Sequence, residues 1–107
     1  MYWGIPGGTF AMITHIVFFR LINPTPANSA MIRDKLLGMW GKIPEIRFIE
    51  VGVDVIRSER SYDLALVTRF DSLADLKAYQ EHPLHAGEVV PHAKSVCSSI
   101  IAVDYET

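Results

Sequence analysis

The chain has 107 residues, half of them hydrophobic, and its ten basic and twelve acidic side chains give a formal net charge of −2. This length fits one domain with an apolar core, and charges mixed along the chain argue against a nucleic-acid-binding surface. No segment reaches the roughly 20 apolar residues that a membrane-spanning helix needs. The single cysteine, Cys97, has no partner for an intrachain disulfide. We therefore predict a cytoplasmic protein without nucleic-acid or membrane partners.

The first eleven residues read as an irregular, apolar arm. They lack a basic start, and Pro6, Gly7 and Gly8 interrupt the apolar residues, so the segment does not have the pattern of a signal peptide. We interpret residues 1–11 as an N-terminal extension and residues 12–107 as the folded domain.

Residues 13–21 are rich in β-branched and aromatic side chains, which favours a strand, and both of its faces are largely apolar. The prolines of the segment 23–26 end the strand, and Thr25 is expected to cap a helix with Pro26 in its first turn. We expect this helix to run to about Trp40. Its predicted buried stripe consists of Ile32, Leu36, Met39 and Trp40.

Two further strands are predicted at about 46–55 and at 62–70, joined as a hairpin by the polar turn 57–61. In the first of them, alternate residues from Arg47 to Val55 form the expected apolar face. Gly52 within that strand suggests a bulge or a close backbone approach.

A second helix is expected after Asp71, where Ser72 and Asp75 have the spacing of a capping box. Pro83 disfavours helical geometry at the residue before it, so this helix should stop at His82. A short helix over 84–90, closed by Pro91, and a last strand over 96–105 complete the chain.

This order of elements predicts an α+β, ferredoxin-like β-α-β-β-α-β fold with an antiparallel sheet. Such a sheet carries helices on one face only, yet the predicted strands are apolar on both faces. An apolar sheet face left in water marks an interface. We therefore predict a homodimer in which two sheets close on each other as a dimeric α/β barrel.

Several short motifs occur in a characteristic order along this pattern. They are His15-Ile16-Val17 with Phe18 and Phe19, Ile43-Pro44, Val51-Gly52, Tyr62-Asp63-Leu64-Ala65, Phe70-Asp71-Ser72, Tyr79-Gln80 with His82-Pro83-Leu84-His85, and Val103-Asp104-Tyr105. With these motifs, the chain from Met12 to Tyr105 resembles the stress-responsive dimeric α/β-barrel family.

The resemblance implies a homodimer. Many members of the family have no established activity, and some cyclise linear polyketides without a cofactor. In those members the second histidine of the His-Pro-x-His motif, helped by a nearby tyrosine, does acid–base work. The matching positions here are His85 and Tyr79, and His15 matches a pocket residue of the same subset. The resemblance thus implies an apolar pocket for a small hydrophobic carbonyl compound, with no cofactor. We also predict no metal site, because the sequence has no His-Glu-x-x-His or Cys-x-x-Cys signature.

Each of these residues also has a structural interpretation. His85 could tie its loop to backbone carbonyls, Tyr79 could pack at the end of a helix, and His15 could be a satisfied core histidine. Two other functions therefore stay open at this point. One is a non-catalytic stress or ligand-binding protein, and the other is a cofactor-free monooxygenase of the wider dimeric α/β-barrel group.

Overall fold

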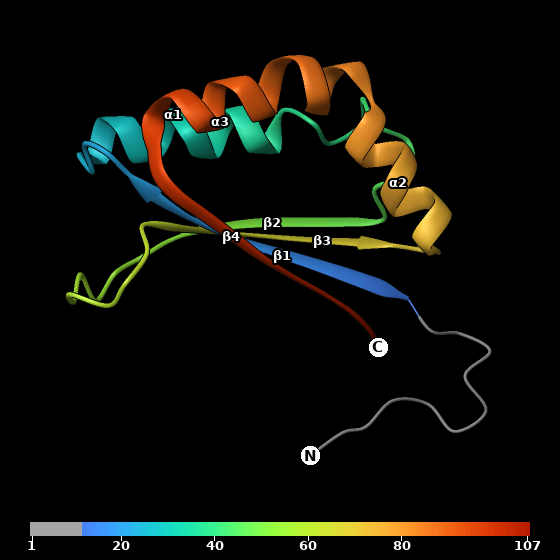
Figure 1. Ribbon diagram of the computed structural model, residues 1–107, viewed down its shortest axis with the longest axis horizontal. Coiled ribbons are helices and arrows are strands. Elements are labelled where there is room, and N and C mark those ends of the chain that lie inside the picture. The colour runs from blue at the N-terminus through green and yellow to red at the C-terminus, as the bar shows by residue number, and fades with distance from the viewer. Residues whose placement is uncertain (1–11) are drawn as a thin grey trace.

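The computed structural model describes residues 12–107, and the predicted extension over residues 1–11 lies outside this described part. The elements in chain order are β1 (Ile13–Leu21), α1 (Pro26–Leu37), β2 (Phe48–Val53), β3 (Leu64–Phe70), α2 (Leu73–Glu81), the π-helical turn η1 (His85–Val89), α3 (Val90–Val96) and β4 (Cys97–Glu106). Figure 1 shows this arrangement.

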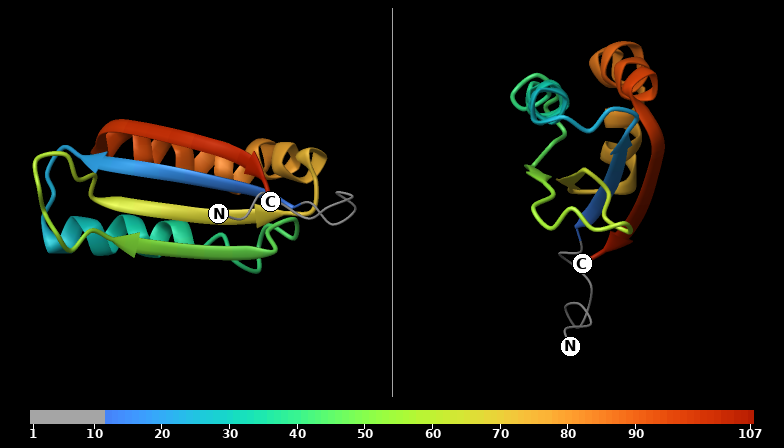
Figure 2. Two further views of the ribbon diagram at one scale, coloured as in Figure 1. Left: turned by 90° about the horizontal axis from the view of Figure 1, so that it is seen from below. Right: turned by 90° about the vertical axis from the view of Figure 1, so that its left-hand side faces the viewer.

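The four strands form one antiparallel sheet in the order β2-β3-β1-β4, with the hairpin of β2 and β3 at one side. This topology confirms the predicted ferredoxin-like α+β fold. The central strand β1 pairs with β3 and β4, and its residue His15 lies opposite Thr68 on β3 and opposite Asp104 on β4. The left view of Figure 2 shows the strands side by side in front of the helices.

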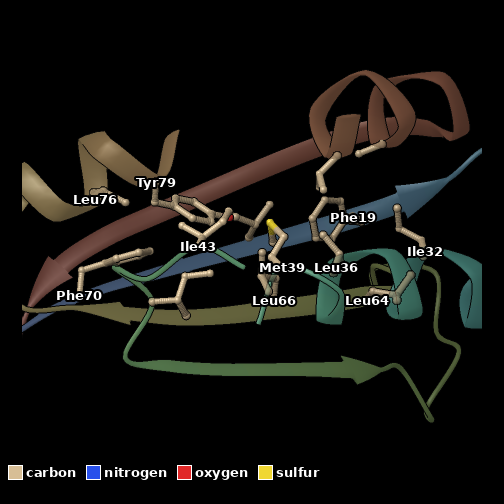
Figure 3. Close-up of a cluster of buried hydrophobic side chains, with 14 of the residues drawn as sticks. Phe19, Ile32, Leu36, Met39, Ile43, Leu64, Leu66, Phe70, Leu76 and Tyr79 are labelled. Atoms are coloured by element: carbon tan, nitrogen blue, oxygen red, sulfur yellow. The ribbon is translucent and has the colours of Figure 1, made fainter. Parts of the chain in front are cut away.

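All of the helices lie against one face of the sheet, which we call the inner face (Figure 2, right). The core lies between this face and the helices, and Figure 3 shows its central side chains. Its buried members are Ile13, Val17, Phe19, Leu21, Ile32, Leu36, Met39, Ile43, Ile46, Leu64, Leu66, Phe70, Leu76, Tyr79, Val89 and Ala93. Burial of these side chains provides the main favourable term in folding.

The opposite face of the sheet, which we call the outer face, is covered by no helix of residues 12–107 (Figure 2). Alternation along the strands places large apolar side chains there, as the sequence predicts. Phe18, Phe48, Ile101, Val103 and Tyr105 are all at least one-third exposed. A single copy of the chain therefore presents several large apolar side chains of one sheet face to water.

The first helix is shorter than predicted. It ends at Leu37, and the backbone N–H of Gly38 bonds to the carbonyls of Asp34 and Leu36. Tight turns follow, in which Met39 N–H bonds to the Leu36 carbonyl. This change of winding keeps Met39 fully buried but turns Trp40 outward, so that its side chain is 53% exposed. The prediction that Trp40 belongs to the buried stripe is therefore wrong.

The strand β2 is also shorter than predicted. Val55 lies beyond its end and is 85% exposed, so it is not part of an apolar strand face. The pairing of β2 with β3 runs through Gly52 without a shift in register, and no atom lies within 4 Å of the position that a Cβ would occupy there. Gly52 therefore marks neither a bulge nor a close approach.

The segment after Pro83 differs from the prediction in one respect. Pro91 does not close a helix, because it lies in the first turn of α3. A proline is tolerated there since the first N–H groups of a helix need no partner within it. The turn η1 precedes α3, and the N–H of Val90 bonds to the carbonyl of His85 five residues earlier. Such π-helical turns are frequent at functional sites.

The side chain of Phe70 offers a direct test of the core. It is fully buried and packs against Tyr79, with ring centroids 5.0 Å apart. We expect Phe70→Ala to lower the free energy of unfolding by about 3–5 kcal/mol, because it leaves a cavity in the core. Urea denaturation measures this loss. The control is Leu73→Ala, at a side chain that is 64% exposed, and a loss of similar size there would contradict the assignment.

Candidate active site

A cavity of about 320 Å³ lies between the inner face of the sheet and the segment that contains η1 and α3. We call it the His85 cavity. Most of its wall is apolar, with contributions from β1, β3, β4, α1 and α3. Its polar lining residues are His15, Tyr79, Gln80, His85 and Lys94. An apolar enclosure with a few convergent polar groups is the usual form of a small-molecule site.

His85 begins the turn η1 and is half-buried. Its Nδ1 lies 3.1 Å from the carbonyl oxygen of Gln80. Because a carbonyl can only accept a hydrogen bond, Nδ1 carries the proton and the neutral ring keeps a free lone pair on Nε2. Burial lowers the pKa of His85, and the nearby His15 and His82 rings add to this effect, whereas the Gln80 carbonyl opposes it. His85 is thus a neutral base near pH 7.

Tyr79 lies on α2 in the centre of the site. Its ring is 4.3 Å from that of His85 and 5.9 Å from that of His15, centroid to centroid. Figure 3 shows its hydroxyl directed away from α2, into the space between sheet and helices. This hydroxyl is buried and has no hydrogen-bond partner among residues 12–107. Burial raises the pKa of Tyr79, and the Asp104 carboxylate acts in the same direction, so the hydroxyl stays protonated and can donate.

The third predicted residue, His15, projects from the inner face of β1 and is buried. Its Nδ1 bonds to the carboxylate of Asp104 on the neighbouring strand β4. Asp104 was not among the residues singled out for chemistry. Its presence in the motif Val103-Asp104-Tyr105 was the available signal, but only the register of β1 with β4 shows that it meets His15.

The structure therefore brings His15, Tyr79 and His85 together around one cavity, although they come from three different elements. Lys94, an exposed residue of α3, also lines the cavity and was missed by the sequence analysis. His82 does not line the cavity. Its Nδ1 accepts a hydrogen bond from the N–H of Leu84, so it shapes the turn after α2.

Other kinds of site have little support within residues 12–107. No three histidine, cysteine or acidic side chains are grouped as metal ligands would be, and no helix has the length and hydropathy to cross a membrane. A larger hollow of about 560 Å³ lies on the outer face beside Phe18 and Tyr62, but it contains no histidine. The His85 cavity is thus the best candidate for chemistry.

Comparisons with known proteins place these features in context. The profile of the Stress responsive A/B Barrel Domain family matches residues 13–107. A crystal structure of a dimeric protein of unknown function with a ferredoxin-like fold, from Bacteroides fragilis, is 32% identical, with a TM-score of 0.74 over 90% of this chain and 96% of that chain. An uncharacterised protein of Streptomyces coelicolor is 28% identical over 81 residues, which cover 73% of this chain and 84% of that protein.

A hydroxynitrile lyase from Passiflora edulis has the same fold. It is 21% identical, with a TM-score of 0.74 over 90% of this chain and 93% of that chain. At this level of identity the likeness concerns the fold alone.

Proposed function

The chain belongs to the stress-responsive A/B barrel domain family, and we propose that it is a homodimeric, cofactor-free acid–base catalyst for a small carbonyl compound. In this proposal the ligand occupies the His85 cavity, His85 is the general base, Tyr79 binds the oxygen that becomes negatively charged, and His15 is a further polar group of the pocket. The reaction is of the polyketide-cyclase type, in which a carbon next to a carbonyl attacks a second carbonyl.

The observation that carries the proposal is the buried Tyr79 hydroxyl, which has no partner among residues 12–107, on a ring that lies against the ring of His85. A buried hydroxyl without a partner costs free energy, and a ligand oxygen in the cavity would relieve that cost. The two rings lie 4.3 Å apart, so one ligand can reach both groups. The volume of about 320 Å³ is near the lower end for ligand cavities, which suits a compound of about one ring.

The proposed reaction begins with removal of a proton from the ligand. His85 Nε2 takes a proton from the carbon next to the carbonyl, and the C–H electron pair forms the enolate. The enolate oxygen accepts a hydrogen bond from the Tyr79 hydroxyl, which stabilises the developing charge. The enolate carbon then bonds to the second carbonyl carbon, and the oxygen of that carbonyl takes the proton that His85 Nε2 removed, which restores the neutral His85. No electron acceptor or metal takes part.

The outer face of the sheet supports the proposed homodimer. Phe18, Ile101 and Val103 form an apolar surface that water solvates poorly, and a second copy can cover it. The Bacteroides fragilis relative, at 32% identity, is a dimeric protein with a ferredoxin-like fold. Two such sheets facing each other would make the barrel.

A non-catalytic ligand-binding protein is the second candidate, because the hydrogen bond from His85 to Gln80 is also what a purely structural histidine would make. The Passiflora edulis protein of this fold is a hydroxynitrile lyase, so the architecture itself is compatible with an enzyme. The two candidates differ in one measurable property, which is whether bound ketones exchange their α-protons.

Deuterium exchange in D2O tests the proposal without knowledge of the natural substrate. We expect the protein to accelerate exchange of the protons between the ring and carbonyl of phenylacetone, as followed by proton NMR. Tyr79→Phe should slow this exchange by about 10²–10³-fold, since it removes one oxyanion donor. The matched control is Tyr105→Phe, on the outer face, which should leave the rate unchanged. Ketone binding without any acceleration would favour the ligand-binding protein.

A further inference from the structure

The contact between His15 and Asp104 joins the His85 cavity to the surface. The side chain of His15 is 9% exposed and lines the cavity, whereas that of Asp104 is 40% exposed. Asp104 lines a separate hollow of about 250 Å³ beside Ile13, Leu73 and Glu106. The Asp104 carboxylate therefore lies between solvent and the His15 imidazole, which lines the His85 cavity.

We propose that His15 is a second proton-transfer catalyst of the cavity, acting on the ligand oxygen, and that Asp104 is the residue that positions it. This assignment rests on the function proposed above and adds two elements to it. It gives His15 a defined step, and it gives Asp104 a role for which the sequence offered no argument.

The hydrogen-bond chemistry fixes which nitrogen of His15 is available. A carboxylate only accepts, so the Nδ1 that bonds to Asp104 carries a proton, and Nε2 is the nitrogen left for the ligand. The carboxylate also stabilises the imidazolium that exists while Nε2 holds a proton, as in other aspartate–histidine pairs. The edge-to-face contact places the His15 ring against the ring of Tyr79, whose hydroxyl is proposed to bind the same oxygen.

The two histidines of the cavity thus have different hydrogen-bond partners, and we assign a different role to each histidine on that basis. His85 bonds to a neutral carbonyl and suits the role of base, whereas His15 bonds to a carboxylate and suits the role of acid.

A purely structural role explains the pair less well. The strands β1 and β4 are already paired from Ile13 opposite Glu106 to Leu21 opposite Cys97, so the sheet does not need this side-chain contact to stay together. Burial of an imidazole among apolar cavity residues also costs free energy that an aliphatic side chain at position 15 would avoid.

The step adds one proton transfer to the reaction. When His85 has removed the C–H proton, the enolate oxygen takes the proton from Nε2 of the His15 imidazolium and becomes an enol. The N–H bond breaks and an O–H bond forms, and His15 becomes neutral with its remaining proton on Nδ1, hydrogen-bonded to Asp104. When the enol carbon bonds to the second carbonyl carbon, the enol O–H proton returns to His15 Nε2 and His85 gives its proton to the new alkoxide, so both histidines regain their starting states.

The test combines side-chain NMR of the full-length protein with the phenylacetone assay. In the wild type, nitrogen-15 spectra should show His15 protonated at Nδ1. In Asp104→Asn the amide can donate to Nδ1, so the proton of the neutral ring should move to Nε2. The imidazolium would lose the carboxylate that stabilises it, and kcat should fall by about 10²-fold with little change in KM. Asp104→Glu should restore the Nδ1 proton and part of kcat.

Glu106→Gln is the matched control. It makes the same change in charge on the same strand and in the same hollow, and it should alter neither the tautomer nor kcat. A switch of tautomer in Asp104→Asn without loss of kcat would overturn the role of His15, and an unchanged tautomer would overturn the role of Asp104. If the wild type shows no exchange at all, the proposed function fails instead, and the NMR result separates the two cases. Thermal unfolding identifies a variant that has merely lost its fold, in which case Asp104→Glu alone decides.

Discussion

His85→Ala is expected to slow α-proton exchange of phenylacetone by about 10²–10⁴-fold, which is the usual contribution of a positioned general base. The reason lies in the geometry of the ring. Its Nδ1 proton is held by the Gln80 carbonyl, and its Nε2 is the only nitrogen free to take a substrate proton. The variant should still fold, because the His85 side chain is only half-buried.

The pH profile gives a second measure of the same residue. Burial lowers the pKa of His85 below its ordinary value of 6.5, mainly by penalising the charged form. The base must be neutral to act, so the rate should fall as the pH drops through the lowered pKa. We therefore expect the acid-side inflection below pH 6.5, and this inflection should be absent from the residual rate of His85→Ala.

His92→Ala is the matched control for His85→Ala. His92 lies in a different hollow, beside Ile22 and Met31, and it does not line the His85 cavity. Its removal should leave both the rate and the pH profile unchanged. Full exchange activity in His85→Ala would show that another group is the base.

Ile101→Glu should convert the proposed dimer into monomers. Ile101 lies on the outer face of β4 and is 47% exposed in the single chain, so the substitution does not disturb the protomer core. In a two-fold dimer the change places two carboxylates in one apolar interface, where an unpaired buried charge costs several kcal/mol. Light scattering at micromolar concentration should then give the mass of one chain.

Val55→Glu is the control for this substitution. Val55 is 85% exposed and lies beyond the end of β2, so the same chemical change there should leave the dimer intact. A wild-type protein that is already monomeric at this concentration would contradict the proposed assembly. So would an Ile101→Glu variant that remains dimeric.

The fold could be predicted because its signals are local and periodic. Alternation in β1 and β3, the cap at Thr25 and the cap at Ser72 each define an element from neighbouring residues. The errors occurred where a tertiary contact or a tight turn decides the outcome. Trp40 continues a helical stripe in the sequence, but the turns after Gly38 rotate it into solvent.

The candidate site could be predicted only in part, for the same reason. Tyr79 and His85 are six residues apart, so a short motif contains both of them. His15 and Asp104 are 89 residues apart and meet only because β1 and β4 are neighbours in a particular register. A shift of one residue would turn Asp104 to the outer face, and no local pattern reports that register.

The described wall of the His85 cavity comes from the inner face of the sheet and from the helices that cover it, and the proposed contact between copies is on the other side of the sheet. A pair of subunits joined through their outer faces would therefore carry two reaction chambers, one on the inner side of each sheet. A substitution in the described wall of one chamber would leave the described wall of the other chamber intact.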